Sequence, residues 1–294
     1  MKNSVKKSRK NLGSELTQFF GFLFLRISVY SVLFILLYFF YDIGRNGHQV
    51  ISWEFLSRVP RRGMTEGGIF PAIIGTFLVT LITALFAVPL GMSAAVYLNE
   101  YARAGWLTRL IRLAIRNLAG VPSIVYGLFG VILLVNMLKL GTSVLSAGLT
   151  LGLLTLPWTI NASEEALKSV PDSYREGALA LGATKWQMIR TNVLPYSIPG
   201  MLTGAVLGLA RAAGETAPIM FTGAAFYLPF LPRSLKDQFM ALPYHLFIMA
   251  TQHHAIDKAK PIAYGTALVL IVFVVVFNLG AVIIRNRLRN KWRP

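Results

Sequence analysis

Long apolar stretches separated by short polar segments dominate the pattern of this chain. Apolar runs lie near residues 21–41, 69–98, 117–138, 143–163, 197–225 and 262–284, and each is close to or above the roughly 20 residues that a helix needs to cross a bilayer. The pattern predicts an all-α membrane protein with six transmembrane helices. Pro89 and Pro218 lie inside two of the runs, and because proline has no N–H to donate, each is expected to kink or end its helix.

Lysine and arginine beside the runs predict the orientation of the chain. Basic residues precede the first run (Lys2, Lys6, Lys7, Arg9, Lys10) and follow the last (Arg285, Arg287, Arg289, Lys291, Arg293). Since positive charge favours the cytoplasmic side, both termini are predicted to be cytoplasmic. The arginines at 103–116 and the loop at 171–195 then fall inside as well. The loop with Arg45, Arg58, Arg61 and Arg62 opposes this orientation, partly balanced by nearby acids.

These boundaries divide the chain into a basic cytoplasmic tail (1–20), a transmembrane domain (21–284) and a second basic tail (285–294). Composition agrees with a membrane protein, since 55% of the residues are hydrophobic, only 14% are charged and the mean hydropathy is +0.58. The net charge of +17 flanks apolar runs and does not gather on one folded face, so no nucleic acid is expected as a partner. The first run is expected to be a retained anchor and not a cleaved signal.

The loop at 171–195 carries the most specific local pattern. Ser173 and Glu176 have capping-box spacing, which predicts a helix from about Tyr174. Gly182 suits the left-handed conformation that ends such a helix, and Thr184 with Gln187 repeats the box for a second short helix. The sequence therefore predicts a compact helical hairpin exposed to water.

Glu176-Gly177-Ala178, then Gly182, then Leu194-Pro195 resembles the "EAA" loop of ABC importer permeases. In that family the loop binds a cytoplasmic ATPase subunit. The resemblance therefore implies that Glu176, Gly177, Ala178 and Gly182 couple this chain to an ATPase. Gly177 stands where Ala is common, and Asn192 stands where Ile is common. The alternative is a stable hairpin without a partner, in which Glu176 is only a capping residue.

The fifth run places small and ionisable residues on one helical face. Gly200, Gly204, Gly208, Arg211 and Glu215 are separated by four, four, three and four residues. Glycines at this spacing let another helix approach closely, so the face is expected to look into a helix bundle.

Ionisable residues within a membrane usually mark a pathway, and the planar guanidinium of Arg211 suits an oxyanion. Glu215 is expected to hold Arg211 and could also accept a proton from hydrogen phosphate. The alternative is an ion pair that only fixes helix packing.

Four further segments, 67–76, 120–127, 211–218 and 241–245, resemble the PstA-type permeases of phosphate-specific ABC importers. The stretch from Glu215 through Thr216 to Pro218 is the most discriminating, and Thr216 joins the predicted substrate pathway. The resemblance implies the type I ABC importer permease architecture and a multi-pass location in the bacterial inner membrane. It also implies a PstC-like companion permease, two PstB-like ATPase subunits and a PstS-like extracytoplasmic phosphate-binding protein.

No Gly-rich loop ending in Gly-Lys-Ser/Thr occurs in the sequence, so no cofactor is expected on this chain, with ATP and Mg on the ATPase partner. A non-catalytic translocation subunit is therefore predicted. Another oxyanion such as molybdate or sulfate remains an alternative cargo, and an ATP-independent channel is a further alternative. His245, His253 and His254 suggest a metal site less strongly than they suggest an external loop that meets a delivery protein.

Overall fold

The computed structural model describes residues 12–291, so Lys2, Lys6, Lys7, Arg9, Lys10 and Arg293 lie outside the described residues. The long helices are α1 (Leu12–Gly47), α3 (Phe70–Val96), α6 (Val144–Lys168), α9 (Leu194–Ala213) and α12 (Ile256–Lys291). The shorter helices are α2 (Trp53–Ser57), α4 (Trp106–Leu118), α5 (Ser123–Gly130), α7 (Asp172–Ala180), α8 (Lys185–Met188), α10 (Ala217–Thr222) and α11 (Leu242–Thr251). The π-helical turns η2 (Tyr97–Tyr101), η3 (Val131–Met137) and η4 (Ile189–Val193) extend α3, α5 and α8, and a small hairpin contains β1 (Pro60–Arg61), the 3-10 turn η1 (Arg62–Met64) and β2 (Glu66–Gly67).

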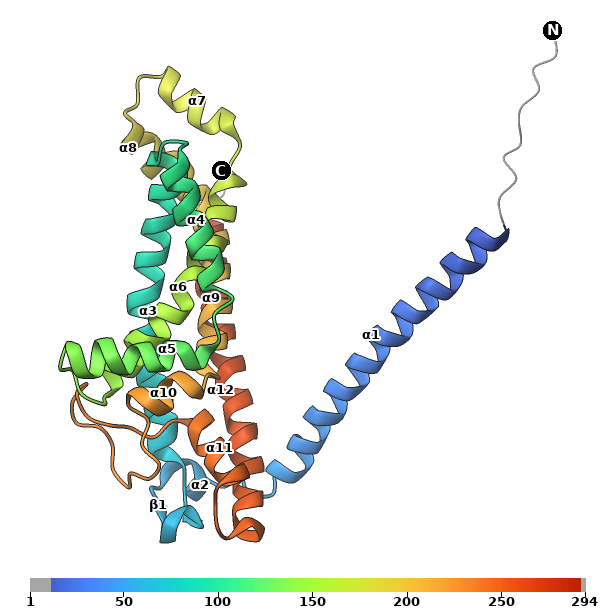
Figure 1. Ribbon diagram of the computed structural model, residues 1–294, viewed down its shortest axis with the longest axis vertical. Helices are drawn as coiled ribbons and strands as arrows, with labels where there is room; N and C mark the ends of the chain where they lie inside the picture. The colour runs from blue at the N-terminus through green and yellow to red at the C-terminus, as the bar shows by residue number, and fades with distance from the viewer. Residues whose placement is uncertain (1–11, 292–294) are drawn as a thin grey trace.

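Four of the long helices form a bundle, with α6 packed against both α3 and α9 (Figure 1). The α7–α8 hairpin lies at one end of the bundle, and the β1–β2 hairpin lies at the other. Helix α6 is the most enclosed span, with 67% of its apolar window buried against 33% for α3. Small residues such as Ala147, Gly148 and Gly152 let its neighbours approach closely. Helix α6 is therefore the central element of the bundle.

Within residues 12–291, five helices are long and apolar enough to cross a membrane, and six if one bent pair counts as a span. The bent pair is α4 with α5 and η3, which meet at 103°. The run predicted near 117–138 therefore contains a sharp bend close to its start: Asn117 and Leu118 end α4, and residues 123–137 form α5 and η3. Proline 122 disfavours helical backbone at the preceding Val121, and Gly120 adds flexibility, so α4 ends and α5 starts in a new direction across the bundle (Figure 1).

The fifth predicted span is also interrupted. Helix α9 ends at Ala213, with Gly214 as its C-cap, and α10 begins at Ala217 with Pro218 in its first turn. Pro218 thus lies where a helix starts, as proline's missing N–H allows. Pro89, in contrast, lies within α3, which continues to Val96. The break after Ala213 directly follows Arg211.

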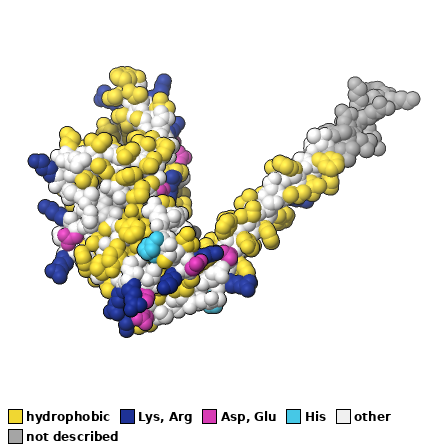
Figure 2. All heavy atoms as spheres, turned by 60° about the horizontal axis from the view of Figure 1, so that its bottom comes forward, with side chains coloured by type: hydrophobic (Ala, Val, Ile, Leu, Met, Phe, Trp, Pro, Cys, Tyr) yellow, Lys and Arg dark blue, Asp and Glu magenta, His cyan; other side chains and the backbone are white. Residues whose placement is uncertain are grey.

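Helix α1 stands away from the bundle and approaches it near its C-terminal end (Figure 1). There the Tyr264 hydroxyl donates to Asp42 at 3.0 Å, and Gly47 lies against the backbone of Tyr264. Figure 2 shows α1 as a largely hydrophobic column, and none of its apolar window is buried in this chain. So large an apolar surface requires lipid or another chain to cover it.

The helices extend into both segments predicted as basic tails. Helix α1 begins at Leu12, within the predicted tail 1–20, and α12 continues to Lys291, within 285–294. At the opposite end of the bundle, Arg58 pairs with Glu54 at 2.6 Å and Arg62 pairs with Glu66 at 2.7 Å. These ion pairs partly neutralise the basic loop that opposes the predicted orientation.

Candidate functional site

The glycine face of α9 packs directly on α6. A Cβ atom added to Gly200 would lie 2.8 Å from the Ala166 methyl group, and one added to Gly204 would clash with Ala162. At Gly208 an added Cβ would lie 3.0 Å from the Thr155 methyl group. The three glycines therefore lie where α9 and α6 approach too closely for larger side chains.

Arg211 and Glu215 lie just past this close contact. Arg211 Nε lies 3.4 Å from Glu215 Oε1, and the guanidinium carbon lies 5.1 Å from the centre of the Trp158 ring on α6. The side chain of Arg211 is 48% exposed, whereas that of Glu215 is 16% exposed. The expectation that both residues look into the bundle fails for Arg211, because its long side chain extends over the half-exposed Trp158.

The guanidinium keeps donor capacity for a ligand. Within residues 12–291, Arg211 uses only Nε in a polar contact, and no carbonyl or side chain accepts from Nη1 or Nη2. Arginine stays charged at any physiological pH and presents its donors in a planar fork that matches an oxyanion. Glu215 and Trp158 hold the group from two sides, so the free edge of the fork is available to an anion.

The backbone beside this pair is irregular. Residues 214–216 separate α9 from α10, and Glu215 N–H donates to the Ala212 carbonyl at 3.2 Å. Thr216 is the N-cap of α10, but its side chain makes no capping hydrogen bond. Within a membrane, non-helical backbone is tolerated where protein buries it or where it lines a water-filled cavity. The break therefore places Arg211, Glu215 and Thr216 together at an interruption of the span.

The hairpin has the predicted shape, with one error in its first cap. The Thr184–Gln187 capping box is confirmed, since the Thr184 N–H donates to Gln187 Oε1 at 2.8 Å and the Gln187 N–H donates to Thr184 Oγ1 at 3.3 Å. Gly182 has a φ of 84°, the left-handed conformation that was expected. The Ser173–Glu176 box is wrong, because α7 starts at Asp172 after Pro171, which makes Ser173 a helical residue.

The residues of the predicted coupling motif differ in exposure. Glu176, Gly177 and Gly182 are exposed, and Ala178 is buried against the apolar cluster at this end of the bundle. Since the first capping box is absent, Glu176 does not serve as its acceptor. Leu181 is 91% exposed and Trp186 is 54% exposed. Ala178 thus fixes the hairpin, while Glu176 and its apolar neighbours face outward.

Sequence patterns missed three side chains at these sites. Trp158 lies in an apolar run without any signal that it contacts Arg211. Arg175 and Glu100 form a buried ion pair at 2.9 Å between the hairpin and the end of α3. They are 75 residues apart in the chain, so no local spacing could reveal the pair.

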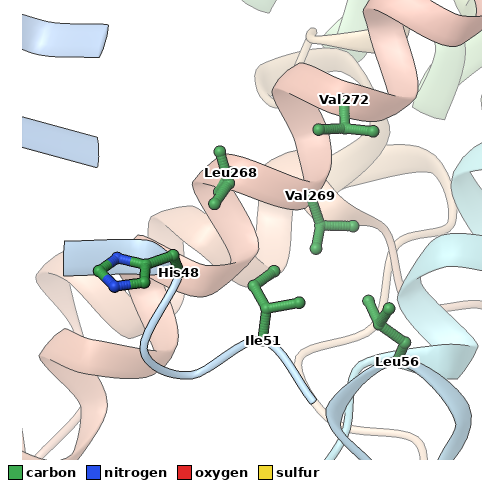
Figure 3. Close-up of a pocket in the computed structure, with 6 residues that line it drawn as sticks. All are labelled: His48, Ile51, Leu56, Leu268, Val269 and Val272. Carbon is green, nitrogen blue, oxygen red and sulfur yellow. The ribbon is translucent and has the colours of Figure 1, made fainter. Parts of the chain in front are cut away.

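Two cavities elsewhere have linings unsuited to an oxyanion. A cavity of about 440 Å³ lies between the end of α1, α2 and α12, and Figure 3 shows aliphatic side chains such as Ile51, Leu56 and Val269 around it, with His48 at its edge. A second, of about 490 Å³, is lined by apolar residues of α4, α5 and α6, including Phe129 and Leu156. Neither lining contains a lysine or arginine side chain.

The three histidines between residues 245 and 254 are engaged separately. His245 is buried and contacts Thr266 Oγ1 at 3.2 Å, and His253 Nε2 lies 2.8 Å from the Gly63 carbonyl. The His254 ring stacks on His253. Among the described residues, no group of three or more His, Cys, Asp or Glu side chains is placed to hold a metal ion.

Solved structures with this fold include a bacterial alginate ABC transporter in complex with an alginate pentasaccharide-bound periplasmic protein. That likeness has a TM-score of 0.68 at 15% identity and covers 95% of this chain and 98% of that chain. The inward-facing MetNI methionine ABC transporter gives a TM-score of 0.60 at 16% identity over 74% of this chain and 94% of the other. The fold is that of the type I ABC importer permeases, as predicted.

Sequence comparison identifies closer relatives. The probable ABC transporter permease protein YqgI of Bacillus subtilis (strain 168) is 34% identical over 247 residues, 80% of this chain and 84% of that protein. The phosphate transport system permease protein PstA of Yersinia pestis is 36% identical over 232 residues, 78% of this chain and 76% of that protein. A family model described as "binding-protein-dependent transport system inner membrane component" matches residues 87–293. This chain is therefore a multi-pass membrane protein that belongs to the family of binding-protein-dependent transport system inner membrane components.

Proposed function

We propose that this chain is the non-catalytic permease subunit of an ATP-driven importer for inorganic phosphate. The observation that carries the proposal is Arg211, whose guanidinium lies at a break in a membrane span with its two Nη donors free within the described residues. Relatives named as phosphate transport permeases, at 36% and 37% identity, support phosphate as the cargo. In this proposal Arg211 receives the anion, Glu215 orients the guanidinium, and Thr216 adds a hydroxyl.

Transport in this proposal proceeds by alternating access. The chain forms half of the pathway, and a companion permease of the PstC-like type forms the other half. The half-exposed guanidinium of Arg211 and the exposed apolar surface of α1 are both compatible with a second subunit beside this one. Electrostatic attraction between a fixed guanidinium and phosphate supplies selectivity for an anion at a depth where water is scarce.

The energy comes from other chains in this scheme. Two PstB-like ATPase subunits hold ATP and Mg and dock at Glu176, Gly177, Ala178 and Gly182, while this chain binds no cofactor. A PstS-like extracytoplasmic protein delivers phosphate to the opposite end of the bundle. This arrangement places both termini and the hairpin in the cytoplasm of a bacterial cell and the bundle in its inner membrane.

The proposal is tested with the complete assembly purified from native membranes and reconstituted in vesicles. ATP hydrolysis should drive uptake of labelled phosphate, and Arg211→Ala should abolish uptake while the assembly remains intact. Arg45→Ala removes an exposed arginine near the end of α1 and serves as the control. Normal uptake by Arg211→Ala would remove Arg211 from the mechanism.

Competition and ATP dependence distinguish the alternative cargoes and mechanisms. Excess unlabelled phosphate should suppress uptake more strongly than molybdate or sulfate at the same concentration. Stronger suppression by molybdate or sulfate would assign the transporter to that oxyanion, and uptake without ATP would assign a channel.

A further inference from the structure

Arg175 connects the α7–α8 hairpin to the ends of two spans, α6 and α3. Its Nη2 donates to the Leu167 carbonyl at 3.0 Å, and its Nη1 donates to the Val170 carbonyl at 2.7 Å. Leu167 lies in the last turn of α6, and Val170 follows the helix. Nη2 also donates to Glu100 Oε1 at 2.9 Å, in the π-helical turn that extends α3. One guanidinium thus joins the hairpin to α6 and α3.

Burial makes this contact specific. The side chain of Glu100 is 5% exposed and that of Arg175 is 17% exposed. Asn99 donates a further hydrogen bond to Glu100 Oε1 at 2.8 Å, which fixes the carboxylate. A buried ion pair stabilises a fold no better than apolar residues of similar size, so its geometry is the more informative property. Arg175 satisfies Glu100 and both carbonyls at the same time, and its Nη1 also donates to Asp172 Oδ1 at 3.2 Å.

Further contacts link the Arg175–Glu100 ion pair to the surroundings of Arg211. Helix α6, whose Leu167 carbonyl accepts from Arg175, carries Trp158, and the Trp158 ring lies under the Arg211 guanidinium. The second helix of the hairpin also reaches α3, since Lys185 Nζ lies 5.1 Å from the Tyr101 ring. A displacement of the hairpin that keeps these contacts must displace the ends of α3 and α6.

We propose that Arg175 and Glu100 form the joint that transmits hairpin movement to α3 and α6, and through α6 to Trp158 and Arg211. Both are positioning residues, and the inference rests on the proposed function as an ATP-driven permease. Packed helices move as rigid elements. The hairpin is small, and Ala178 is the one buried residue of its first helix, α7. Helix α8 continues through η4 into α9, so movement of the hairpin reaches α9 along the chain. For α3 and α6, the directional contact with the hairpin is that of Arg175 with Glu100 and with the Leu167 carbonyl.

The experiment measures ATP hydrolysis and phosphate uptake of the reconstituted assembly in parallel. Glu100→Gln keeps the shape of the side chain and removes its charge, and Arg175→Lys keeps the charge and removes the fork. Both variants should assemble with the ATPase subunits and hydrolyse ATP, and phosphate moved per ATP hydrolysed should fall roughly tenfold, within the usual range of coupling between sites. A merely structural role would lower the yield of assembly without changing that ratio.

Glu165→Gln is the matched control, because it makes the same change at a glutamate of α6 that pairs with Lys168 at the exposed surface. It should leave the ratio unchanged. If both Glu100→Gln and Arg175→Lys moved as much phosphate per ATP hydrolysed as the unmodified assembly, the proposed role of the Arg175–Glu100 pair would be wrong. Failure of both variants to assemble would also contradict it. An unmodified assembly that hydrolyses ATP without moving phosphate would instead overturn the proposed function, and the joint with it.

Discussion

The guanidinium carbon of Arg211 lies 5.1 Å from the centre of the Trp158 ring, so a side chain of α6 supports the arginine of α9. A cation over an indole face gains about 0.5 to 2 kcal/mol, depending on how far water is excluded. Trp158 therefore restricts where the fork of Arg211 points, together with Glu215.

Trp158→Leu should weaken phosphate uptake without abolishing it. Leucine keeps apolar contact but has no π face, so the apparent affinity for phosphate should fall by about two- to thirtyfold, the loss that corresponds to the cation–π energy. The measurement is the phosphate concentration for half-maximal uptake in reconstituted vesicles. Trp106→Leu changes a tryptophan that is 76% exposed on α4 and should leave that concentration unchanged. Equal effects from the two variants would contradict a specific role for Trp158.

Gly204→Ala should destabilise the α6–α9 contact. The added methyl group would overlap the Ala162 side chain, and overpacking of this kind costs about 1 to 3 kcal/mol. The readout is the melting temperature in detergent. Gly280→Ala makes the same change on α12, where no atom lies within 4 Å of the added Cβ, and should not lower the melting temperature. Similar melting temperatures for the two variants would show that α9 can move away from α6 at no cost.

Local spacing predicted much of this molecule. The apolar runs gave the spans, Gly182 has the left-handed backbone, and the Thr184–Gln187 box forms, because each depends on residues close together in the chain. The glycine face of α9 packs on α6, since its spacing follows from helical geometry alone. The bend at Val121-Pro122 was missed because the apolar run continues across it, whereas the break before Pro218 agrees with the expectation that this proline would kink or end its helix.

Contacts between distant segments could not be predicted from spacing. Arg175 appears in the sequence as one charge of a polar loop, and Glu100 as one acid after an apolar run. Their 2.9 Å contact arises because the hairpin returns to the end of α3. The Ser173 cap failed for a local reason, since Pro171 and Asp172 start the helix earlier and Ser173 then lies inside it.

Thr184→Ala should loosen the second half of the hairpin. Loss of an N-cap costs about 1 kcal/mol, so amide hydrogen exchange over residues 185–193 should accelerate by about fivefold if that energy is lost locally. Ser173→Ala is the matched control, because no side-chain cap bond starts α7 and little change is expected there. If Ser173→Ala accelerated amide exchange in α7 while Thr184→Ala left exchange in residues 185–193 unchanged, Ser173 and not Thr184 would be the capping residue.

His245 should make stability sensitive to acid. Burial, with a smaller contribution from the charge of His253, lowers the pKa of His245 from 6.5 to about 4. Between these values the unfolded chain binds a proton that the folded chain does not, so stability should fall as the pH drops from 6.5 towards 4. The full loss corresponds to about 3 kcal/mol, and near pH 5 to about 2 kcal/mol.

His245→Gln removes this titration and should therefore flatten the dependence of melting temperature on pH between 7 and 5. Its stability at pH 7 should be lower by about 1 kcal/mol, because the contact with Thr266 is disturbed, and only the slope with pH tests the titration. His48→Gln replaces an exposed histidine and should keep the slope of the unmodified protein. A slope that persists in His245→Gln would mean that another group, and not the buried imidazole, takes up the proton on unfolding.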